Sequence, residues 1–336
     1  MILYDPRQPH SILEFGIEIP VMDSRASETF ARLCSHPVLG ARVGLWHIDR
    51  VQEHVAREDL LRVHSADYVS RLFSGHLEAE IIRTFELIDP NGNYHRYNPG
   101  KASQPLTVLF DRILVRVAGT IQCCRTALEK GFCFYFGGGM HHAQKDYGAG
   151  FCIVNDVVIA LRKLKAEGRI RTAWVIDVDA HKGDGTAALT AVDDSIVTLS
   201  IHMARGWPLD QPEVDSGGRF NPSFVPSTID IPIEAGEEHR YNQQLKDGLE
   251  SLAGYPPPDL ALVVCGADPY ELDELPSTAG LRLSLDQLLE RDRLVYSFLK
   301  TRGLPGAWLM AGGYGRNSWQ VYTQFLEWAL LERMKL

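Results

Sequence analysis

The segment Asp177-Val-Asp-Ala-His181 carries two carboxylates and one imidazole at alternating positions behind an apolar run. In an extended chain alternate side chains point to the same side, so these three are expected to face one region. Asp268, in Cys-Gly-Ala-Asp-Pro, offers another carboxylate far along the chain. Two carboxylates and one imidazole suit a divalent metal and leave a zinc ion an open position for water and substrate. The pattern predicts a catalytic metal site; a hydrogen-bonded polar strand end is the alternative.

Two adjacent histidines, His141 and His142, follow a glycine-rich segment at 137–139. Glycine lets the backbone pass close to other groups. One interpretation makes both histidines metal ligands. The other makes them an acid/base pair in which a carboxylate fixes the tautomer of each ring and raises its basicity. Asp177 and Asp184 are the carboxylates available for this second role.

A tyrosine, Tyr314, ends the segment Ala311-Gly-Gly-Tyr. Two flexible glycines allow its hydroxyl to lie over a reacting carbonyl, where it would stabilise developing negative charge. By itself, however, a Gly-Gly-Tyr sequence is typical of an ordinary turn, so this residue gains meaning only beside the other two motifs.

These polar groups follow short apolar runs with the composition of strands buried on both faces. Helical periodicity separates some of the runs, at 155–165 and 285–299. The alternation predicts an α/β fold with a central, mainly parallel β-sheet flanked by helices, in one domain over residues 1–336. Ligands bind beyond the carboxyl ends of the strands in such sheets. The expected strands are 133–136, 172–178, 196–201, 260–265 and 307–310, and His202 directly follows the third of them.

The first hundred residues are less regular than the rest. Residues 56–76 have a helical pattern. Residues 89–104 combine Pro, Gly, Asn and Tyr, which is typical of a long surface loop. Such a loop is either functional or a plain connector.

Acidic residues outnumber basic ones, 43 to 34, for a net charge of −9. This balance argues against nonspecific nucleic-acid binding, which requires a basic surface. The six cysteines form no Cys-x-x-Cys pair, so we expect reduced core residues. The N-terminal segment lacks a signal-peptide pattern, and no apolar run approaches the roughly 20 residues of a membrane helix. We therefore expect a cytoplasmic protein without membrane or direct nucleic-acid partners.

Four blocks of sequence resemble the signatures of the zinc-dependent histone deacetylase family, which includes the acetylpolyamine amidohydrolases and has the arginase/deacetylase fold. They occur in that family's order, and residues 60–72 resemble its N-terminal helix. The segment Ala118-Gly-Thr120 and the AGGY sequence are most similar to class IV members. The blocks are GGGMHHAQKDYGAGFCIVND (137–156), DVDAHKGDGT (177–186), GADPYELDEL (266–275) and AGGYGRNS (311–318).

The resemblance implies a role for each matching residue. In the tandem pair His141–His142 the second is the usual general base, Asp177 and Asp184 are the carboxylate partners, and Tyr314 polarises the carbonyl. The implied zinc ligands are Asp179, His181 and Asp268. The implied substrate-binding residues are Gly150, Phe151, Trp207, Leu275 and Gly312. The implied structural potassium site consists of Asp177, Asp179, His181, Ser200 and Ile201.

Two positions depart from the family pattern. Lys182 follows the implied zinc ligand where many relatives have another residue, and we expect a solvated side chain there. The acidic rim residue that holds the substrate backbone in many relatives has no clear match; Asp89 is the candidate. Substrate choice is therefore less well predicted than the chemistry.

The resemblance predicts zinc-dependent hydrolysis of an acyl amide on a primary amine, with acetyl-lysine or a related acyl-lysine as substrate. An acetylpolyamine or small-molecule amidohydrolase is one alternative, and a catalytically silent binder of acylated lysine is another. A two-metal ureohydrolase of the arginase type would need carboxylates at Tyr270 and Gly183, where neither occurs. Acyl length and oligomeric state stay open.

Overall fold

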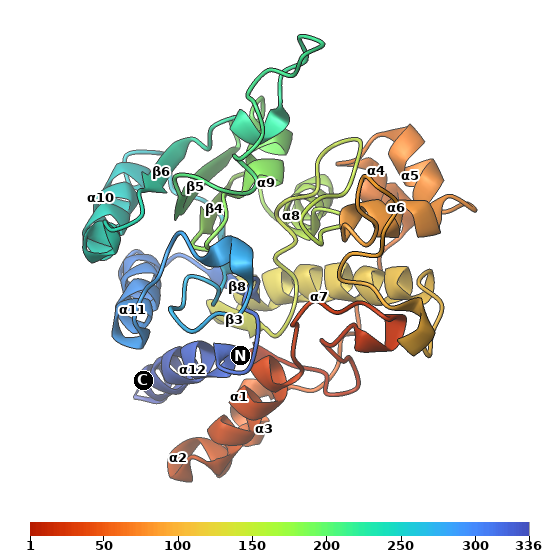
Figure 1. Ribbon diagram of the computed structural model, residues 1–336. Helices are drawn as coiled ribbons and strands as arrows, with labels where there is room; N and C mark the ends of the chain where they lie inside the picture. Colours follow the sequence, from red (N-terminus) through yellow and green to blue (C-terminus); the bar gives the residue numbers. More distant parts are fainter. Residues whose placement is uncertain (336) are drawn as a thin grey trace.

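The computed structural model describes residues 1–335, and its strands form one eight-stranded sheet (Figure 1). The strand order is β2-β1-β3-β8-β7-β4-β5-β6, and every neighbouring pair is parallel. The predicted α/β class with a parallel central sheet is confirmed. The strands are β1 (Ile2–Leu3), β2 (His47–Ile48), β3 (Phe132–Tyr135), β4 (Ala173–Asp177), β5 (Ile196–Met203), β6 (Ile229–Ile233), β7 (Leu260–Cys265) and β8 (Gly306–Met310).

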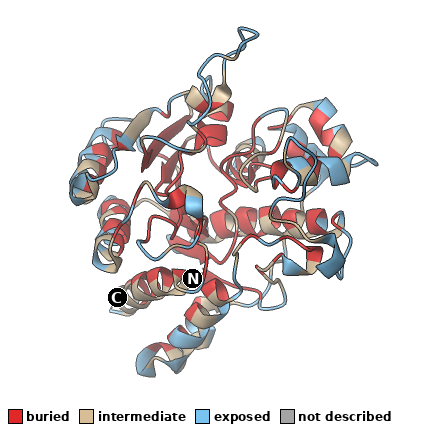
Figure 2. Ribbon diagram, in the orientation of Figure 1, coloured by how far each residue is buried: buried red, intermediate tan, exposed pale blue. Residues whose placement is uncertain are grey.

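Helices cover both faces of the sheet, because side chains alternate along each strand. On β7, Leu262 and Val264 belong to one hydrophobic core, and Val263 and Cys265 belong to the other. Buried residues accordingly fill the sheet and the inner sides of the helices (Figure 2). The first core includes residues of α4 to α8, and the second includes residues of α1 to α3 and α10 to α12. The helices are α1 (Ser24–Ser35), α2 (Pro37–Gly40), α3 (Val43–Trp46), α4 (Arg57–Leu61), α5 (Ala66–Leu72), α6 (Leu77–Thr84), α7 (Val108–Lys130), α8 (Asp156–Ala166), α9 (Asp184–Thr190), α10 (Tyr241–Leu252), α11 (Leu285–Thr301) and α12 (Ser318–Met334).

The predicted strands and the two predicted helices are confirmed to within a few residues, with three corrections. β5 extends to Met203, so His202 lies inside the strand and does not follow it. Residues 56–76 contain two helices, α4 and α5, and not one. The strands β1, β2 and β6 were not predicted: two are only two residues long, and β6 contains Pro232 at the edge of the sheet. None of the three gives a continuous apolar run.

The four signature blocks follow four strands that are neighbours in the sheet. Residues 137–142 follow β3, 311–314 follow β8, 266–268 follow β7, and 178–184 follow β4. Because all four strands are parallel, their carboxyl ends meet at one edge of the sheet. Segments far apart in the sequence are thereby brought to one place.

Two expectations from composition can be compared with the fold. All six cysteines are free, and five of them are buried, as predicted. Within the described part of the chain, no helix has both the length and the apolar character needed to cross a membrane.

Candidate active site

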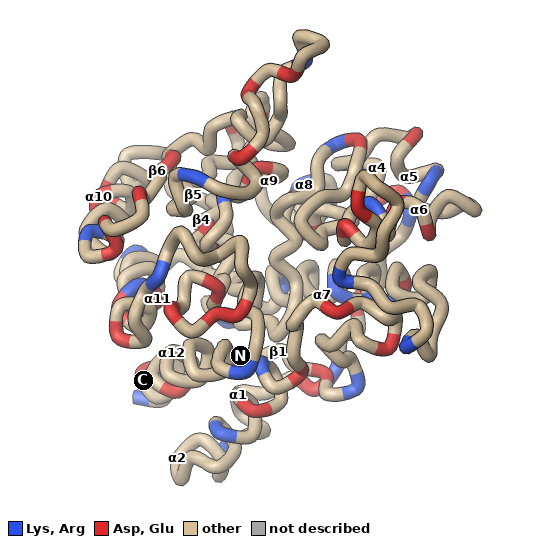
Figure 3. The backbone as a smooth tube through the Cα atoms, viewed as in Figure 1, with Lys and Arg blue, Asp and Glu red and all other residues tan. Residues whose placement is uncertain are grey.

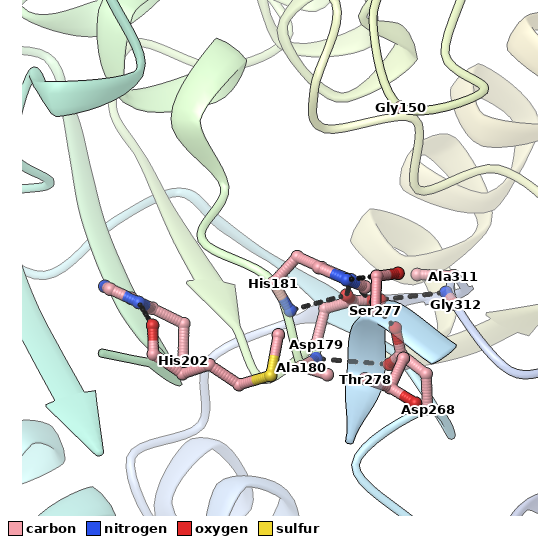
Figure 4. A network of polar contacts seen from close by, with 12 residues as sticks. Gly150, Asp179, Ala180, His181, His202, Asp268, Ser277, Thr278, Ala311 and Gly312 are labelled. Carbon is pink, nitrogen blue, oxygen red and sulfur yellow. Dashed lines mark hydrogen bonds and ion pairs between the residues drawn. The ribbon is translucent and has the colours of Figure 1, made fainter. Parts of the chain in front are cut away.

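Asp179, His181 and Asp268 each place one ligand atom within 4.8 Å of those of the other two (Figure 4). Asp179 and His181 follow β4, and Asp268 follows the neighbouring strand β7. Nδ1 of His181 lies 3.5 Å from Oδ1 of Asp179 and 3.3 Å from Oδ2 of Asp268. All three side chains are buried. The sequence prediction that these residues converge is therefore correct, and together they present two oxygens and one nitrogen.

Backbone groups hold the two carboxylates in place. The amide of Gly312 donates to Oδ2 of Asp179 at 2.9 Å, and the amide of Ala180 donates to Oδ1 of Asp268 at 3.1 Å. A Cβ atom at Gly312 or at Gly266 would collide with both carboxylates. Glycine is required at these two positions because the chain passes directly against the cluster.

The donor set fits a divalent metal such as zinc. Oδ2 of Asp268 is buried and has no hydrogen-bond partner, so one lone pair of the cluster is left for a ligand. Burial and the charge of Asp179 raise the pKa of Asp268 to about 6. Burial opposes the charged form of His181, but Asp179 and Asp268 outweigh it and raise the His181 pKa to about 10. This negative potential favours a bound cation, and zinc commonly takes one imidazole and two carboxylates as ligands.

The two histidines next to the cluster are each held by a carboxylate. Nδ1 of His141 lies 2.6 Å from Oδ2 of Asp177, and Nδ1 of His142 lies 2.7 Å from Oδ1 of Asp184. The other oxygen of Asp184 accepts a hydrogen bond from Ser223 at 2.6 Å. Both rings therefore turn Nε2 away from their carboxylates. Neither histidine belongs to the cluster of Asp179, His181 and Asp268, and this favours the acid/base interpretation of the pair over metal binding.

The pKa values of the two histidines are driven apart. Burial opposes protonation of His141, but Asp177 and Asp179 outweigh it and raise its pKa to about 9. Burial and the charge of His141 lower the pKa of His142 to about 4, although Asp184 acts in the opposite direction. Their ring centroids are only 3.9 Å apart, so a proton on one disfavours a proton on the other. Near neutral pH, His142 is the uncharged member and can act as a base.

Tyr314 lies on a loop that other side chains fix. Its amide donates to Oδ2 of Asp273 at 2.7 Å. Buried Arg25 donates to the carbonyl oxygens of Met310, Ala311 and Gly313 just before it. Burial raises the pKa of the Tyr314 hydroxyl, with Asp268 and Asp179 adding to the effect. The phenol therefore stays protonated and remains a hydrogen-bond donor at neutral pH.

A pocket of about 430 Å³ leads from the surface to this cluster. The ring of Trp207 lies 4.5 Å from that of His142, and Phe151 lies 6.3 Å from Tyr314, edge to face in both cases. A Cβ at Gly150 would collide with Trp207 and His142, so glycine keeps this passage open. Four of the five predicted substrate-binding residues line the pocket: Gly150, Phe151, Trp207 and Leu275.

A second cavity, of about 100 Å³, is lined by Asp179 and His181. Gly312, the fifth predicted substrate-binding residue, lines this inner cavity and not the outer pocket. His10 is buried and lines this cavity together with Arg25 and Arg116. The inner cavity and the outer pocket share lining residues, among them Gly150, Phe151 and Tyr314, so the two adjoin each other.

A model of the histone deacetylase domain matches residues 20–328, most of the chain. The chain belongs to the histone deacetylase family. Membership implies an amide hydrolase. An uncharacterized protein of Picosynechococcus is 32% identical over 76% of this chain and 75% of its own length. The acetoin utilization protein AcuC of Staphylococcus aureus is 30% identical over 81% of this chain and 67% of its own.

Histone deacetylase 2 of Arabidopsis thaliana is 26% identical to this member of the family over 80% of the chain, which spans 64% of the plant protein. A crystal structure of an HDAC homolog from Aquifex aeolicus has the same fold, with a TM-score of 0.67 at 21% identity. The match covers 98% of this chain and 82% of that one. Another crystal structure, of an HDAC homolog complexed with SAHA, matches equally well. The arginase/deacetylase fold predicted from the sequence is confirmed.

Three sequence interpretations are corrected within this histone deacetylase site. β4 ends at Asp177, so turns and not strand alternation place Asp179 and His181. The amide of Asp179 donates to the Asp177 carboxylate, and the amide of His181 donates to the Asp179 carboxylate. Lys182 is buried and not solvated, because Asp230 lies 3.6 Å from its Nζ. Asp89 does not line the pocket, because its carboxylate accepts hydrogen bonds from Asn91 and Asn93 in its own loop.

The potassium site stays a prediction. Asp177 on β4 and Ser200 on β5 are partners in register. The Ser200 hydroxyl accepts a hydrogen bond from the amide of Gly183 at 3.4 Å, and Ile201 is buried beside it.

Sequence reasoning missed several residues that support the histone deacetylase site. Ser277 contacts Nε2 of His181 at 3.2 Å. Asp156 accepts hydrogen bonds from the amides of Gly139 and Met140 and so shapes the glycine-rich segment. Asp156 closes the first signature block, which is a signal that could have found it. Ser277 and Arg25 lie in segments without a chemical motif, and only the folded chain brings them here.

Proposed function

We propose that this protein is a zinc-dependent deacylase that hydrolyses the amide between an acyl group and a primary amine. One observation carries the proposal: a buried donor set with a free carboxylate lone pair lies beside a histidine pair whose members are each held by a carboxylate. Asp179, His181 and Asp268 would hold the zinc ion. When bound there, zinc acts as a Lewis acid on the acyl carbonyl and on the attacking water.

His142 acts as the general base in this proposal. Its Nδ1 is committed to Asp184, so Nε2 carries the free lone pair that accepts the proton of the attacking water. Asp184 stabilises the imidazolium that results. The charged His141 lies beside it, and either histidine can return a proton to the leaving amine.

Tyr314 stabilises the charge that develops on the acyl oxygen. Its hydroxyl is protonated, and Arg25 holds its loop through hydrogen bonds to the carbonyl oxygens of Met310 and Gly313. The Tyr314 hydroxyl therefore needs little reorganisation to donate a hydrogen bond during the reaction. One such donor is typically worth about 3 kcal/mol of the barrier.

The substrate would be an acylated lysine or another acylated amine. Phe151 and Trp207 offer aromatic surfaces on either side of Gly150, a narrow passage suited to an alkyl chain. The likeness in fold to an HDAC homolog complexed with SAHA supports a ligand of this shape.

A hydrolysis screen of the zinc-loaded protein tests the proposal. Acetyl-lysine peptides, longer acyl-lysine peptides and acetylated polyamines are compared, each with and without a hydroxamate on a linear linker. We expect release of free amine that the hydroxamate abolishes, because it chelates the metal while its chain fills the pocket by Phe151. Binding of acylated peptides without hydrolysis would instead identify a silent binder. Hydrolysis that a saturating hydroxamate leaves untouched would contradict the zinc mechanism.

A further inference from the structure

Three residues other than glycine have a positive φ within the described residues, and all three line the mouth of the outer pocket. They are Glu86 and Arg96, both at +53°, and Phe151 at +65°. This conformation is unfavourable for residues with a Cβ and persists only where surrounding contacts impose it. Such strain concentrates at binding sites. The conformation of these three residues at the mouth is therefore imposed by the surrounding contacts.

These three residues also contact one another. Nη1 of Arg96 lies 3.2 Å from Oε2 of Glu86, and the Arg96 guanidinium lies 5.6 Å from the centre of the Phe151 ring. The backbone holds the arrangement, because the Arg96 carbonyl accepts from the amide of Glu18 at 2.8 Å and the Phe151 amide donates to Thr84 at 3.2 Å. Glu86 engages one nitrogen of Arg96 at the edge of the pocket. The remaining guanidinium nitrogens are available to a ligand.

A carboxylate from a distant segment lines the same pocket. Asp210 follows Trp207 in the segment after β5, whereas Arg96 lies in the segment between α6 and α7. Asp210 is exposed, and within the described residues its side chain makes no hydrogen bond or ion pair. Basic and acidic residues are interspersed along the chain, so these charges act locally (Figure 3). The mouth thus presents a cation and a free carboxylate above one narrow passage.

We propose that this mouth recognises a free amino acid acylated on its side-chain amine, with Arg96 binding the α-carboxylate and Asp210 binding the α-ammonium. The inference rests on the proposed deacylase function and names its substrate class. When the acylated side chain fills the passage to the metal ligands, the two α-groups remain at the mouth. Glu86 is then a positioning residue that fixes Arg96.

The other substrate classes match this mouth less well. A lysine inside a protein has neutral amides in place of both α-charges, so Arg96 and Asp210 would have no charged partner. A polyamine offers only cations, so Asp210 would have a partner but Arg96 would have no anion to bind. Opposite charges that line one pocket are complementary to a zwitterion.

A matched series of substrates tests the proposal on the zinc-loaded protein. The series is Nε-acetyl-L-lysine, its α-carboxamide, its Nα-acetyl derivative, and the neutral compound with both changes. We expect the free amino acid to have the highest kcat/KM, and each lost charge to lower it about tenfold or more, since hydrogen bonds between charged groups are worth that much. Equal or faster hydrolysis of the neutral compound, or a preference for acetylspermidine, would overturn the proposal.

Two variants assign the charges. Arg96→Gln should no longer distinguish the carboxylate from the carboxamide, and Asp210→Asn should no longer distinguish the α-ammonium from its acetylated form. Arg219→Gln is the matched control, because Arg219 forms a similar exposed pair with Asp215 outside the pocket; it should keep both preferences. Arg96→Lys, which keeps the charge, should keep part of the carboxylate preference.

The outcomes separate this proposal from the proposed function. If neither this series nor any acyl-lysine peptide or acetylated polyamine is hydrolysed, the deacylase function fails. If only the peptides or polyamines are hydrolysed, the deacylase function stands and the assignment of the mouth fails. If all are hydrolysed alike, only the assignment of the mouth fails. Wild-type discrimination that Arg96→Gln and Asp210→Asn both leave intact would also contradict the assignment.

Discussion

The inner end of the pocket, which we call its floor and which contains Asp179, His181 and Asp268, differs in construction from the mouth. At the floor, Asp179 and Asp268 are each 1% exposed and are fixed by backbone amides from neighbouring loops. At the mouth, Glu86 and Asp210 are exposed side chains from segments without regular structure. The floor therefore consists of buried polar groups that need partners, whereas the charges of the mouth are carried by exposed side chains on loops, where substitution is tolerated more easily. Under our proposals, the first region sets the reaction type and the second sets the substrate choice.

The same difference explains what the sequence could predict. The motifs at 177–184 and 266–268 are local, follow apolar strands, and have chemistry that their residue types reveal. The fold class and the convergence of Asp179, His181 and Asp268 were therefore predicted correctly. No motif contains Glu86, Arg96 and Asp210. Their position in one pocket depends on the conformation of loops, which sequence periodicity does not predict. Asp89 was a wrong candidate because a free carboxylate and one engaged in its own turn look alike in a sequence.

The largest effect is expected at the floor. Asp268→Ala removes a proposed zinc ligand, and Asp268→Asn keeps its shape but removes its charge. Both variants should lose metal. The activation barrier should then rise by about 5 kcal/mol, which lowers kcat/KM several thousandfold, because the Lewis acid is lost. Metal analysis and hydrolysis assays check this. Retained activity in either variant would contradict the claim that hydrolysis depends on the residues of the floor.

His142→Ala should cost about a thousandfold in kcat/KM, within the range of general bases. A base works only when unprotonated, so in the wild type activity should be present above the low pKa of His142 and be lost as the pH falls through it. The variant should lack this acidic limb. A pH profile identical in shape to that of the wild type would assign the base to another group.

Tyr314→Phe separates the oxyanion donor from the metal ligands. The barrier should rise by about 3 kcal/mol, roughly a hundredfold in rate, because one hydroxyl is lost. Metal content and substrate affinity should change little, since the bond matters mainly as charge develops on oxygen. Single-turnover rates with metal analysis measure both. Full activity would show that another group stabilises the oxyanion.

Gly150→Ala tests the passage between floor and mouth and should have the smallest effect, about tenfold in kcat/KM. The new methyl group would meet Trp207 and His142 and narrow the passage. Gly92→Ala is the matched control, because Gly92 also has a positive φ but open space around it. Both should lose about 1 kcal/mol of stability for the left-handed conformation, and Gly150→Ala should lose more because its methyl group collides with its neighbours. Only Gly150→Ala should lose activity. Equal activities of the two variants would mean that the substrate still passes when a methyl group narrows the passage.

The most direct test of the account is a zinc titration of the chelator-treated protein, with hydrolysis of acetyl-lysine followed at each addition. The three donors of Asp179, His181 and Asp268 predict that activity rises from near zero and saturates at one zinc ion per chain. Activity that needs two ions per chain, or that persists in the metal-free protein, would contradict the account.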